Sequence, residues 1–279
     1  MKRKIILAKH AGFCFGVKRA LNMLVRTRNK NKNKKVYIYG PLIHNPQEIK
    51  RLEKKGIKTV YKFNKDVKDI LVIRAHGVPD SLIKKAEEKE LEIVDATCPF
   101  VRKVHDISKE LEKKGYQVVI FGDAYHPEVV GIAGNLNDPI VIEELELINH
   151  FPFIEKIALV AQTTQDQNKF EKAAEFLRKK CKELVVKNTI CSATGQRQDF
   201  SKKLAEKSDI MIIIGGKNSG NTKRLYEICK SVKKDCYHIE TEKELKKEWF
   251  DKKKVVGVTA GASTPDWIIE NVINRIKEF

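Results

Sequence analysis

The chain has no long apolar run and no closely spaced pair of cysteines. No segment approaches the ~20 consecutive apolar residues that a membrane span requires. The early apolar run, Ile5 to Ala8, is too short for a secretory signal. None of the six cysteines lies in a C-x-x-C pair, which argues against a zinc ribbon. We therefore expect a cytoplasmic protein whose cysteines serve as ligands or core residues rather than as disulfides.

Acidic residues are few relative to basic ones. The 279 residues include 55 Lys and Arg against 37 Asp and Glu, a net charge of +18. Such a balance favours an anionic partner, although most of the lysines fall on polar helix faces or in the connector 29–35, where they are solvated. A nucleic-acid-binding protein is one alternative, but the sequence contains no RNP, KH or zinc-knuckle pattern and no aromatic platform beside its basic runs.

Three cysteines, Cys14, Cys98 and Cys191, each open the same kind of segment. A helix-like stretch follows each one, and then an apolar run. The run ends in glycine 24 to 26 residues after the cysteine, at Gly40, Gly122 and Gly215. One unit used three times predicts three α/β units, over residues 1–97, 98–190 and 191–279. The first strand, within residues 1–13, is expected near the centre.

Apolar strands alternate with amphipathic helices along the chain, which predicts parallel α/β sheets. The expected strands cover residues 5–8, 36–39, 70–73, 117–121, 157–161, 210–214 and 255–259. The expected helices cover about 16–28, 46–55, 99–114, 129–134, 168–180, 196–207 and 222–232, with a last one from about 265. Ligands of such sheets gather at the carboxyl ends of the strands.

Polar side chains follow six of these strands, two in each predicted unit, so we expect a shared site. They are His44, His76, His126, Thr163, Ser219 and Ser263. Imidazole, hydroxyl and amide donors suit a phosphate group, and Asn221 adds an amide. The glycines between 215 and 220 allow close backbone approach, although the loop G-G-K-N-S-G-N-T lacks the order of a P-loop.

Any single cysteine is most often an ordinary core residue, but the repeat sets three of them apart. Three thiolates suit an iron–sulfur cluster that keeps one iron open for a substrate, while a zinc hydrolase that uses Cys and His is the alternative. Cys181 and Cys229 fall within helical patterns, and Cys236 begins the strand-like C-Y-H-I. We interpret these last three as structural.

Glu128 stands in the tripeptide H-P-E, two residues after His126. A carboxyl group beside a buried cluster has a raised pKa, which suits a general acid. The commoner role for Glu at such a position is favourable interaction with the first turn of a helix. The sequence leaves both interpretations open.

Taken together, these motifs resemble the LytB-type 4-hydroxy-3-methylbut-2-enyl diphosphate reductase family over essentially the whole chain. The motifs that carry the resemblance occur in this order: A-G-F-C-F-G-V-K-R-A, G-P-L-I-H-N, R-A-H-G-V, D-A-T-C-P-F-V, H-P-E, Q-T-T, T-I-C-S-A-T-G-Q-R-Q, G-K-N-S-G-N-T and T-A-G-A-S-T-P-D. Several motifs in one order are far more specific than any one of them.

The resemblance implies a trefoil of three α/β domains around a 4Fe–4S cluster with one open iron, held by Cys14, Cys98 and Cys191. It implies a two-electron reductive dehydroxylation of the allylic diphosphate that yields isopentenyl and dimethylallyl diphosphates, the last step of the non-mevalonate isoprenoid pathway. It also implies ferredoxin or flavodoxin as electron donor. From the missing apolar span and the missing binding motifs we expect neither a membrane nor a nucleic acid as partner.

The resemblance further implies roles for individual residues. Glu128 would deliver protons, Thr163 would orient the hydroxyl, and Thr194 would place a hydroxyl beside the cluster. The diphosphate would be held by His44, His76, His126, Ser219, Asn221 and Ser263, with His126 and Thr163 also close to the chemistry. The family's loop usually reads N-S-S-N, whereas this chain has Asn218-Ser219-Gly220-Asn221. The backbone N–H of Gly220 would take the place of the missing hydroxyl.

Overall fold

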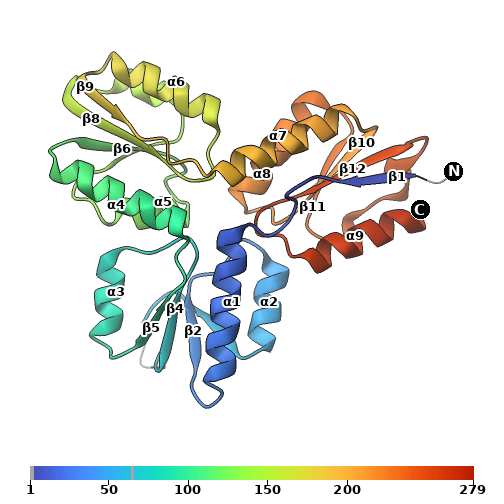
Figure 1. Ribbon diagram of the computed structural model, residues 1–279, viewed down its shortest axis with the longest axis horizontal. Helices are drawn as coiled ribbons and strands as arrows, with labels where there is room; N and C mark the ends of the chain where they lie inside the picture. Colours follow the sequence, from blue (N-terminus) through green and yellow to red (C-terminus); the bar gives the residue numbers. More distant parts are fainter. Residues whose placement is uncertain (1–2, 64–65) are drawn as a thin grey trace. The chain divides into compact units, whose positions relative to one another are not determined.

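The computed structural model describes residues 3–63 and 66–279. In this part of the chain the strands form three four-stranded sheets in which every strand pair is parallel. Helices flank each sheet (Figure 1). The predicted α/β class, with three parallel-sheet units, is confirmed.

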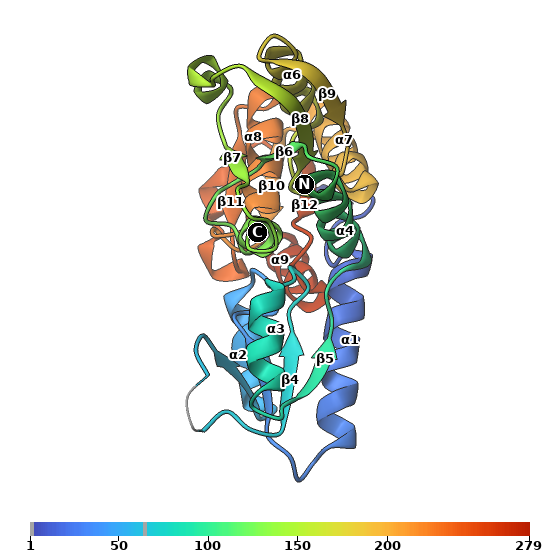
Figure 2. The same cartoon turned by 90° about the vertical axis from the view of Figure 1, so that its left-hand side faces the viewer.

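One sheet has the strand order β3-β2-β4-β5. Its strands are β2 (Val36–Tyr39), β3 (Ile57–Val60), β4 (Ile70–Ile73) and β5 (Glu92–Asp95). Its segment of the chain includes the helices α1 (Phe15–Lys30), α2 (Pro46–Lys54) and α3 (Asp80–Glu87). Helices α1 and α3 lie on opposite sides of β4 and β5 (Figure 2). All four residues of β4 are buried, as expected for a central strand covered on both faces.

A second sheet has the order β7-β6-β8-β9. Its strands are β6 (Gln117–Phe121), β7 (Ile140–Ile142), β8 (Ile154–Ala161) and β9 (Cys181–Val186). The helices of this segment are α4 (Pro99–Lys113), α5 (Pro127–Ala133), the 3-10 turn η1 (Leu145–His150) and α6 (Gln167–Arg178). Cys181 begins β9 rather than lying in a helix, so its predicted helical position is wrong.

The third sheet has the order β1-β12-β10-β11. Its strands are β1 (Lys4–Leu7), β10 (Ile210–Ile214), β11 (Cys236–Ile239) and β12 (Val255–Ala260). Its other elements are α7 (Ser192–Glu206), α8 (Gly220–Val232), the 3-10 turns η2 (Glu242–Glu244) and η3 (Lys247–Phe250), and α9 (Asp266–Glu278). The N-terminal β1, blue in Figure 1, lies beside β12 in this sheet.

The position of β1 corrects one expectation. The sequence assigns this strand to the first unit because it comes first in the chain, but Lys4 pairs with Val255. Neighbouring strands in a sheet need not be neighbours in sequence, and a short apolar run carries no information about its partner. The boundaries of the three predicted units stay a prediction.

Two compact units can be distinguished. One comprises Met1–Lys18, His44–Arg51 and Ser192–Phe279, and contains the third sheet. The other comprises Arg19–Ile43 and Leu52–Cys191, and contains the other two sheets. We call them unit 1 and unit 2. None of the helices in the described ranges combines the length and apolarity that a membrane crossing requires.

Local sequence explains where the helices begin and end. Pro99 occupies the first turn of α4, where its missing N–H costs nothing. Asp166 caps α6 by accepting a hydrogen bond from the N–H of Lys169. Gly115 follows α4 with φ +81°, a conformation that ends helices and that glycine adopts without strain. These signals give the predicted helices bounds close to the observed ones.

Candidate functional site

Six polar residues follow the carboxyl ends of central strands, as the sequence predicts. They are His44 after β2, His76 after β4, His126 after β6, Thr163 after β8, Ser219 after β10 and Ser263 after β12. His44, Ser219 and Ser263 belong to unit 1, together with Cys14, Thr194, Gly220 and Asn221. His76, His126 and Thr163 belong to unit 2, together with Cys98, Glu128 and Cys191.

The three repeat cysteines share a local setting. Cys14 precedes α1 and its carbonyl accepts a hydrogen bond from the N–H of Lys18. Cys98 is the N-terminal cap residue of α4, and Cys191 directly precedes α7, which begins earlier than predicted. These three are half-buried, whereas Cys181, Cys229 and Cys236 are buried. A helix N-terminus carries partial positive charge, which favours anionic ligands.

In unit 1, two loops meet at the ends of β10 and β12. The hydroxyl of Thr264 donates to the carbonyl of Ile214 (3.0 Å), and the N–H of Gly261 donates to the same carbonyl (2.9 Å). A Cβ on Gly215 would lie 2.7 Å from the hydroxyls of both Thr222 and Thr264. The two loops, one of which carries Ser219 and the other Ser263, therefore pack closely against each other.

Asn221 is the clearest indication of a ligand in unit 1. Its side chain is only 6% exposed, and neither its Oδ1 nor its Nδ2 has a hydrogen-bond partner among the described residues. A buried polar group without a partner costs about 1–3 kcal/mol. A ligand with complementary groups would remove that cost. Ser219, by contrast, caps α8 by accepting a hydrogen bond from the N–H of Thr222 (3.3 Å).

The backbone of His44 packs against the loop that follows β10. A Cβ on Gly216 would lie 2.6 Å from the carbonyl oxygen of His44, so only glycine allows this approach. The next residue, Asn45, caps α2 by accepting from the N–H of Glu48 (2.9 Å). The buried carboxylate of Glu48 accepts a hydrogen bond from the indole N–H of Trp267 on α9 (3.0 Å). These contacts fix the start of α2 within unit 1.

In unit 2, Glu128 and Thr163 form a buried hydrogen-bonded pair. The backbone N–H of Thr163 donates to Oε1 of Glu128 (2.6 Å), and its hydroxyl donates to Oε2 (2.9 Å). Burial raises the pKa of Glu128 to about 7, although both hydrogen bonds from Thr163 oppose that rise. Glu128 also lies in the first turn of α5. The two sequence interpretations therefore coincide at one residue.

His126 caps α5 with its side chain. Its Nδ1 accepts a hydrogen bond from the N–H of Glu128 (3.2 Å), so in the neutral imidazole the proton is on Nε2. The ring lies edge to face with that of His76, at 5.5 Å between centroids and 86° between planes. Unit 2 thus brings together two of the predicted histidines.

Backbone hydrogen bonds connect these groups to the two cysteines of unit 2. The N–H of Cys191 donates to the carbonyl of Thr163 (2.9 Å), and the N–H of Cys98 donates to the carbonyl of Ala75, next to His76 (2.9 Å). Each cysteine is therefore one hydrogen bond away from a loop that carries a predicted site residue.

His105 is a residue whose role the sequence analysis missed. It lies on the buried stripe of α4, and its Nδ1 is 2.9 Å from the side-chain nitrogen of Asn135. Burial lowers its pKa to about 4, so the ring is neutral near pH 7. Atoms of the ring come within 3.2 Å of a Cβ built on Gly77 and within 3.5 Å of one built on Gly131. The ring thus packs against both the His76 loop and α5. The signal in the sequence was a polar residue among the apolar positions of a helix.

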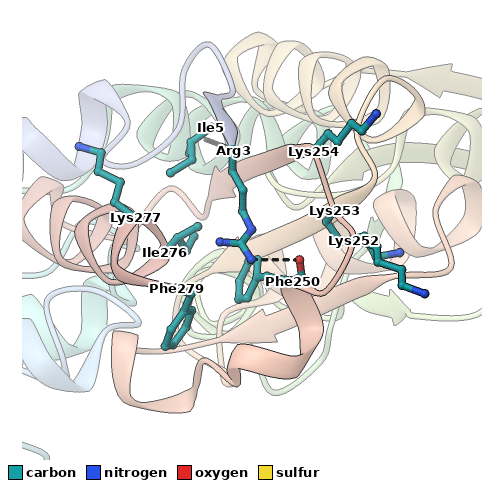
Figure 3. Close-up of a pocket in the computed structure, with 9 residues that line it drawn as sticks. All are labelled: Arg3, Ile5, Phe250, Lys252, Lys253, Lys254, Ile276, Lys277 and Phe279. Atoms are coloured by element: carbon teal, nitrogen blue, oxygen red, sulfur yellow. Dashed lines mark hydrogen bonds between the residues drawn. The ribbon is translucent and has the colours of Figure 1, made fainter. Parts of the chain in front are cut away.

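A basic groove of about 780 Å³ lies elsewhere in unit 1 (Figure 3). Arg3 extends into it and donates from Nη2 to the carbonyl of Phe250 (3.3 Å). It adjoins the amino ends of β1 and β12, where the N–H of Lys4 donates to the carbonyl of Lys254 (2.8 Å). The polar loops lie at the carboxyl ends of the same sheet, so this groove is separate from them.

Comparison with known proteins agrees with the motifs. The sequence model of the LytB protein family matches residues 5–277. A 4-hydroxy-3-methylbut-2-enyl diphosphate reductase of a Nitratiruptor species is 47% identical over 278 residues, 99% of both chains. The protein of that name from Aquifex aeolicus is 48% identical over 279 residues, 99% of this chain and 96% of the relative.

Two solved structures share the fold. One, described as (E)-4-hydroxy-3-methyl-but-2-enyl diphosphate reductase, the terminal enzyme of the non-mevalonate pathway, is 47% identical with a TM-score of 0.74 over 99% of this chain and 100% of that one. The E-1-hydroxy-2-methyl-but-2-enyl-4-diphosphate reductase from Plasmodium falciparum is 27% identical with a TM-score of 0.89, over 98% of this chain and 88% of that one. With a family match over nearly all of its length and relatives at 47% and 48% identity, the chain belongs to the LytB protein family.

Proposed function

We propose that the protein is an iron–sulfur reductase that converts (E)-4-hydroxy-3-methylbut-2-enyl diphosphate to isopentenyl and dimethylallyl diphosphates, as the last step of the non-mevalonate isoprenoid pathway. Two relatives at 47% and 48% identity bear the name of this reductase. The observation that carries the proposal is the buried carboxyl of Glu128, hydrogen-bonded to Thr163, whose own carbonyl accepts from Cys191. A buried carboxyl in the first turn of α5 and a metal-ligand candidate before α7 are thus both connected to Thr163 by hydrogen bonds.

Cys14, Cys98 and Cys191 are the proposed ligands of a 4Fe–4S cluster. Cysteine thiolates are the usual ligands of iron–sulfur clusters. The positive N-terminus of the helix that follows each cysteine favours a negatively charged ligand there. Three thiolates leave one iron of a four-iron cluster open. When bound, the cluster would pass on two electrons, one at a time, from the external donor and would offer a Lewis-acidic iron to the allylic hydroxyl. Thr194, buried in the first turn of α7, is the proposed hydroxyl beside it.

The diphosphate needs several converging donors, because charge-assisted hydrogen bonds are roughly twice as strong as neutral ones. The unpartnered amide of Asn221 supports this role. The Nδ1 of His126 is an acceptor, so its neutral ring carries the proton on Nε2. The proposed donors are those that the family resemblance implies: His44, His76, His126, Ser219, Asn221, Ser263 and the N–H of Gly220.

Glu128 is the proposed proton source. With a pKa raised to about 7 by burial, a large fraction of the carboxyl is protonated at neutral pH, as a general acid requires. The carbon–oxygen bond of the allylic hydroxyl breaks, the oxygen takes one proton and leaves as water, and the allyl group takes two electrons and a second proton. The Thr163 hydroxyl donates its hydrogen to Glu128. The lone pairs of the Thr163 hydroxyl oxygen can then accept a hydrogen bond from the substrate hydroxyl.

The reaction requires an external reductant that delivers electrons one at a time. Ferredoxin or flavodoxin is the proposed donor, and the net charge of +18 would attract an acidic protein of this kind. Oxygen-sensitive thiolate ligands also favour a reducing compartment, so we infer a cytoplasmic location.

Product analysis tests the proposed function. Anaerobic protein with a chemical reductant and the hydroxylated diphosphate is expected to form both isopentenyl and dimethylallyl diphosphates. Thr163→Val, which keeps the backbone N–H but removes the hydroxyl, should retain the metal and slow the reaction by about 10²-fold or more. Wild-type protein with an intact cluster that forms neither product would refute the proposal.

A further inference from the structure

The buried face of α7 is polar. Its buried residues include Thr194, Arg197, Gln198 and Ser201, where an amphipathic helix would place apolar side chains. Arg197 is only 3% exposed. Arginine is rarely buried to this extent without a specific structural use.

The guanidinium of Arg197 binds the loop that leads into Cys14. Its Nε donates to the carbonyl of His10 (2.8 Å), and its Nη2 donates to the carbonyl of Gly12 (2.8 Å). Both accepting residues have left-handed backbone, with φ +67° at His10 and +87° at Gly12. The loop therefore has two residues in the left-handed conformation, and the Arg197 side chain hydrogen-bonds to the carbonyl of each.

Contacts with the segment that follows β12 also support the loop. The N–H of Gly12 donates to the carbonyl of Ala260 (3.4 Å), and that of Cys14 donates to the carbonyl of Ala262 (3.2 Å). A Cβ on Gly12 would lie 3.0 Å from Cδ1 of Ile269 on α9. The backbone before Cys14 is thus fixed between the end of β12, the start of α9 and Arg197.

We infer that Arg197 is a positioning residue that fixes the Cys14 loop, and through it the Cys14 thiolate, for metal binding. This inference rests on the proposed iron–sulfur function. Arg197 acts through the two carbonyls rather than by touching the metal or the substrate. The planar guanidinium presents two donors in a fixed fork, so Arg197→Lys restores the charge but not the paired geometry.

The test compares Arg197→Met, Arg197→Lys and Ser201→Ala. Ser201 lies one turn further along α7 and its hydroxyl is 2.7 Å from that of Thr259, so Ser201→Ala removes a buried hydrogen bond of α7 outside the Cys14 loop. The first readout is the alkylation rate of individual cysteines by iodoacetamide in metal-free protein, resolved by peptide mass spectrometry. We expect Cys14 to react about tenfold faster in Arg197→Met, since one charge-assisted hydrogen bond is worth roughly that factor.

The expected pattern is specific. Arg197→Lys should give an intermediate rate, Ser201→Ala the wild-type rate, and Cys98 should react alike in all variants. In reconstituted holoprotein, the release of iron to a chelator should quicken in the order Ser201→Ala, Arg197→Lys, Arg197→Met. Equal Cys14 rates in Arg197→Met and Ser201→Ala would overturn the inference.

Two further outcomes are distinguishable. If Arg197→Met does not fold, Gly12→Ala perturbs the same loop through its φ of +87° and the contact with Ile269. It should speed Cys14 alkylation, and an unchanged rate would count against the inference. If wild-type protein binds no iron, the proposed function fails, while the alkylation rates of metal-free protein still decide whether Arg197 holds the loop.

Discussion

Replacing Glu128 with glutamine isolates the contribution of one buried carboxyl. Glutamine has nearly the same shape, its oxygen can accept from the N–H of Thr163, and its NH₂ can donate to the Thr163 hydroxyl. The change therefore removes the titration and the proton while it keeps both contacts that the structure shows. Any pH-dependent difference from wild type then reports on the carboxyl itself.

The magnitude follows from the pKa. Burial raises the pKa of Glu128 from 4.5 to about 7, and one pKa unit corresponds to about 1.4 kcal/mol. Because the folded-state pKa is raised, this group's contribution to stability is fully present below about pH 4.5 and is lost as pH rises through about 7. As pH rises through this range, the unfolding free energy of wild type falls by about 3 kcal/mol, whereas that of Glu128→Gln does not change through this group.

The assay is urea unfolding of metal-free protein at several pH values. The stability advantage of Glu128→Gln should grow from less than about 1 kcal/mol near pH 5 to about 3 kcal/mol near pH 8. Glu175→Gln, an exposed change on α6, serves as the control and should show no such trend. In reconstituted protein, Glu128→Gln should keep the cluster and bind substrate, but turn over about 10²–10⁴-fold more slowly.

Two results would refute this reasoning. A stability difference that is independent of pH would mean that the carboxyl is ionised or solvated in the fold. Near-normal turnover would remove Glu128 from the mechanism, whatever its pKa.

Three further predictions concern the metal and the diphosphate. Cys14→Ser should lose or destabilise the cluster and its colour whereas Cys181→Ser, at a buried strand residue, should keep both; a colourless Cys181→Ser protein would reverse this assignment. Asn221→Ala should raise KM by on the order of tenfold with little change in the visible spectrum, and an unchanged KM would exclude it from the site. Gly220→Ser should fold normally, because a Cβ there meets nothing within 4 Å, and should lower KM through the added hydroxyl; a higher KM would show that the loop needs glycine.

The central strands and their polar ends could be predicted because burial on both faces leaves a simple pattern. Ile210–Ile214 is buried at every residue, and a continuous apolar run is its direct trace in the sequence. Edge strands lack that trace. In β5, Glu92–Asp95, no residue is fully buried, and the pattern there is too weak to predict a strand.

Cys181 shows how a pattern misleads. The buried residues Ala173, Ala174 and Leu177 of α6 recur with a helical period, and Cys181 continues it four residues later. The chain instead leaves the helix after Arg178, and Cys181 begins the edge strand β9. The apolar period persists because Cys181 joins the same core cluster from the strand.

For the candidate site, the sequence predicted which residues take part but not which contacts they make. Motif order and strand ends predicted the cysteines, the histidines and Glu128 as candidates. The sequence could not show that Glu128 meets Thr163, 35 residues away, or that Arg197 binds a loop 185 residues earlier in the chain. In a sequence rich in lysine and arginine, each basic side chain is expected to be solvated. The structure shows that Arg197 is buried.

The most direct test of the proposed iron–sulfur function is the metal content and activity of anaerobically purified protein. We expect brown protein with about four irons and four sulfides per chain, and consumption of the hydroxylated diphosphate when a reductant is added. Colourless protein that cannot be reconstituted, or stoichiometric zinc without sulfide, would contradict the proposal.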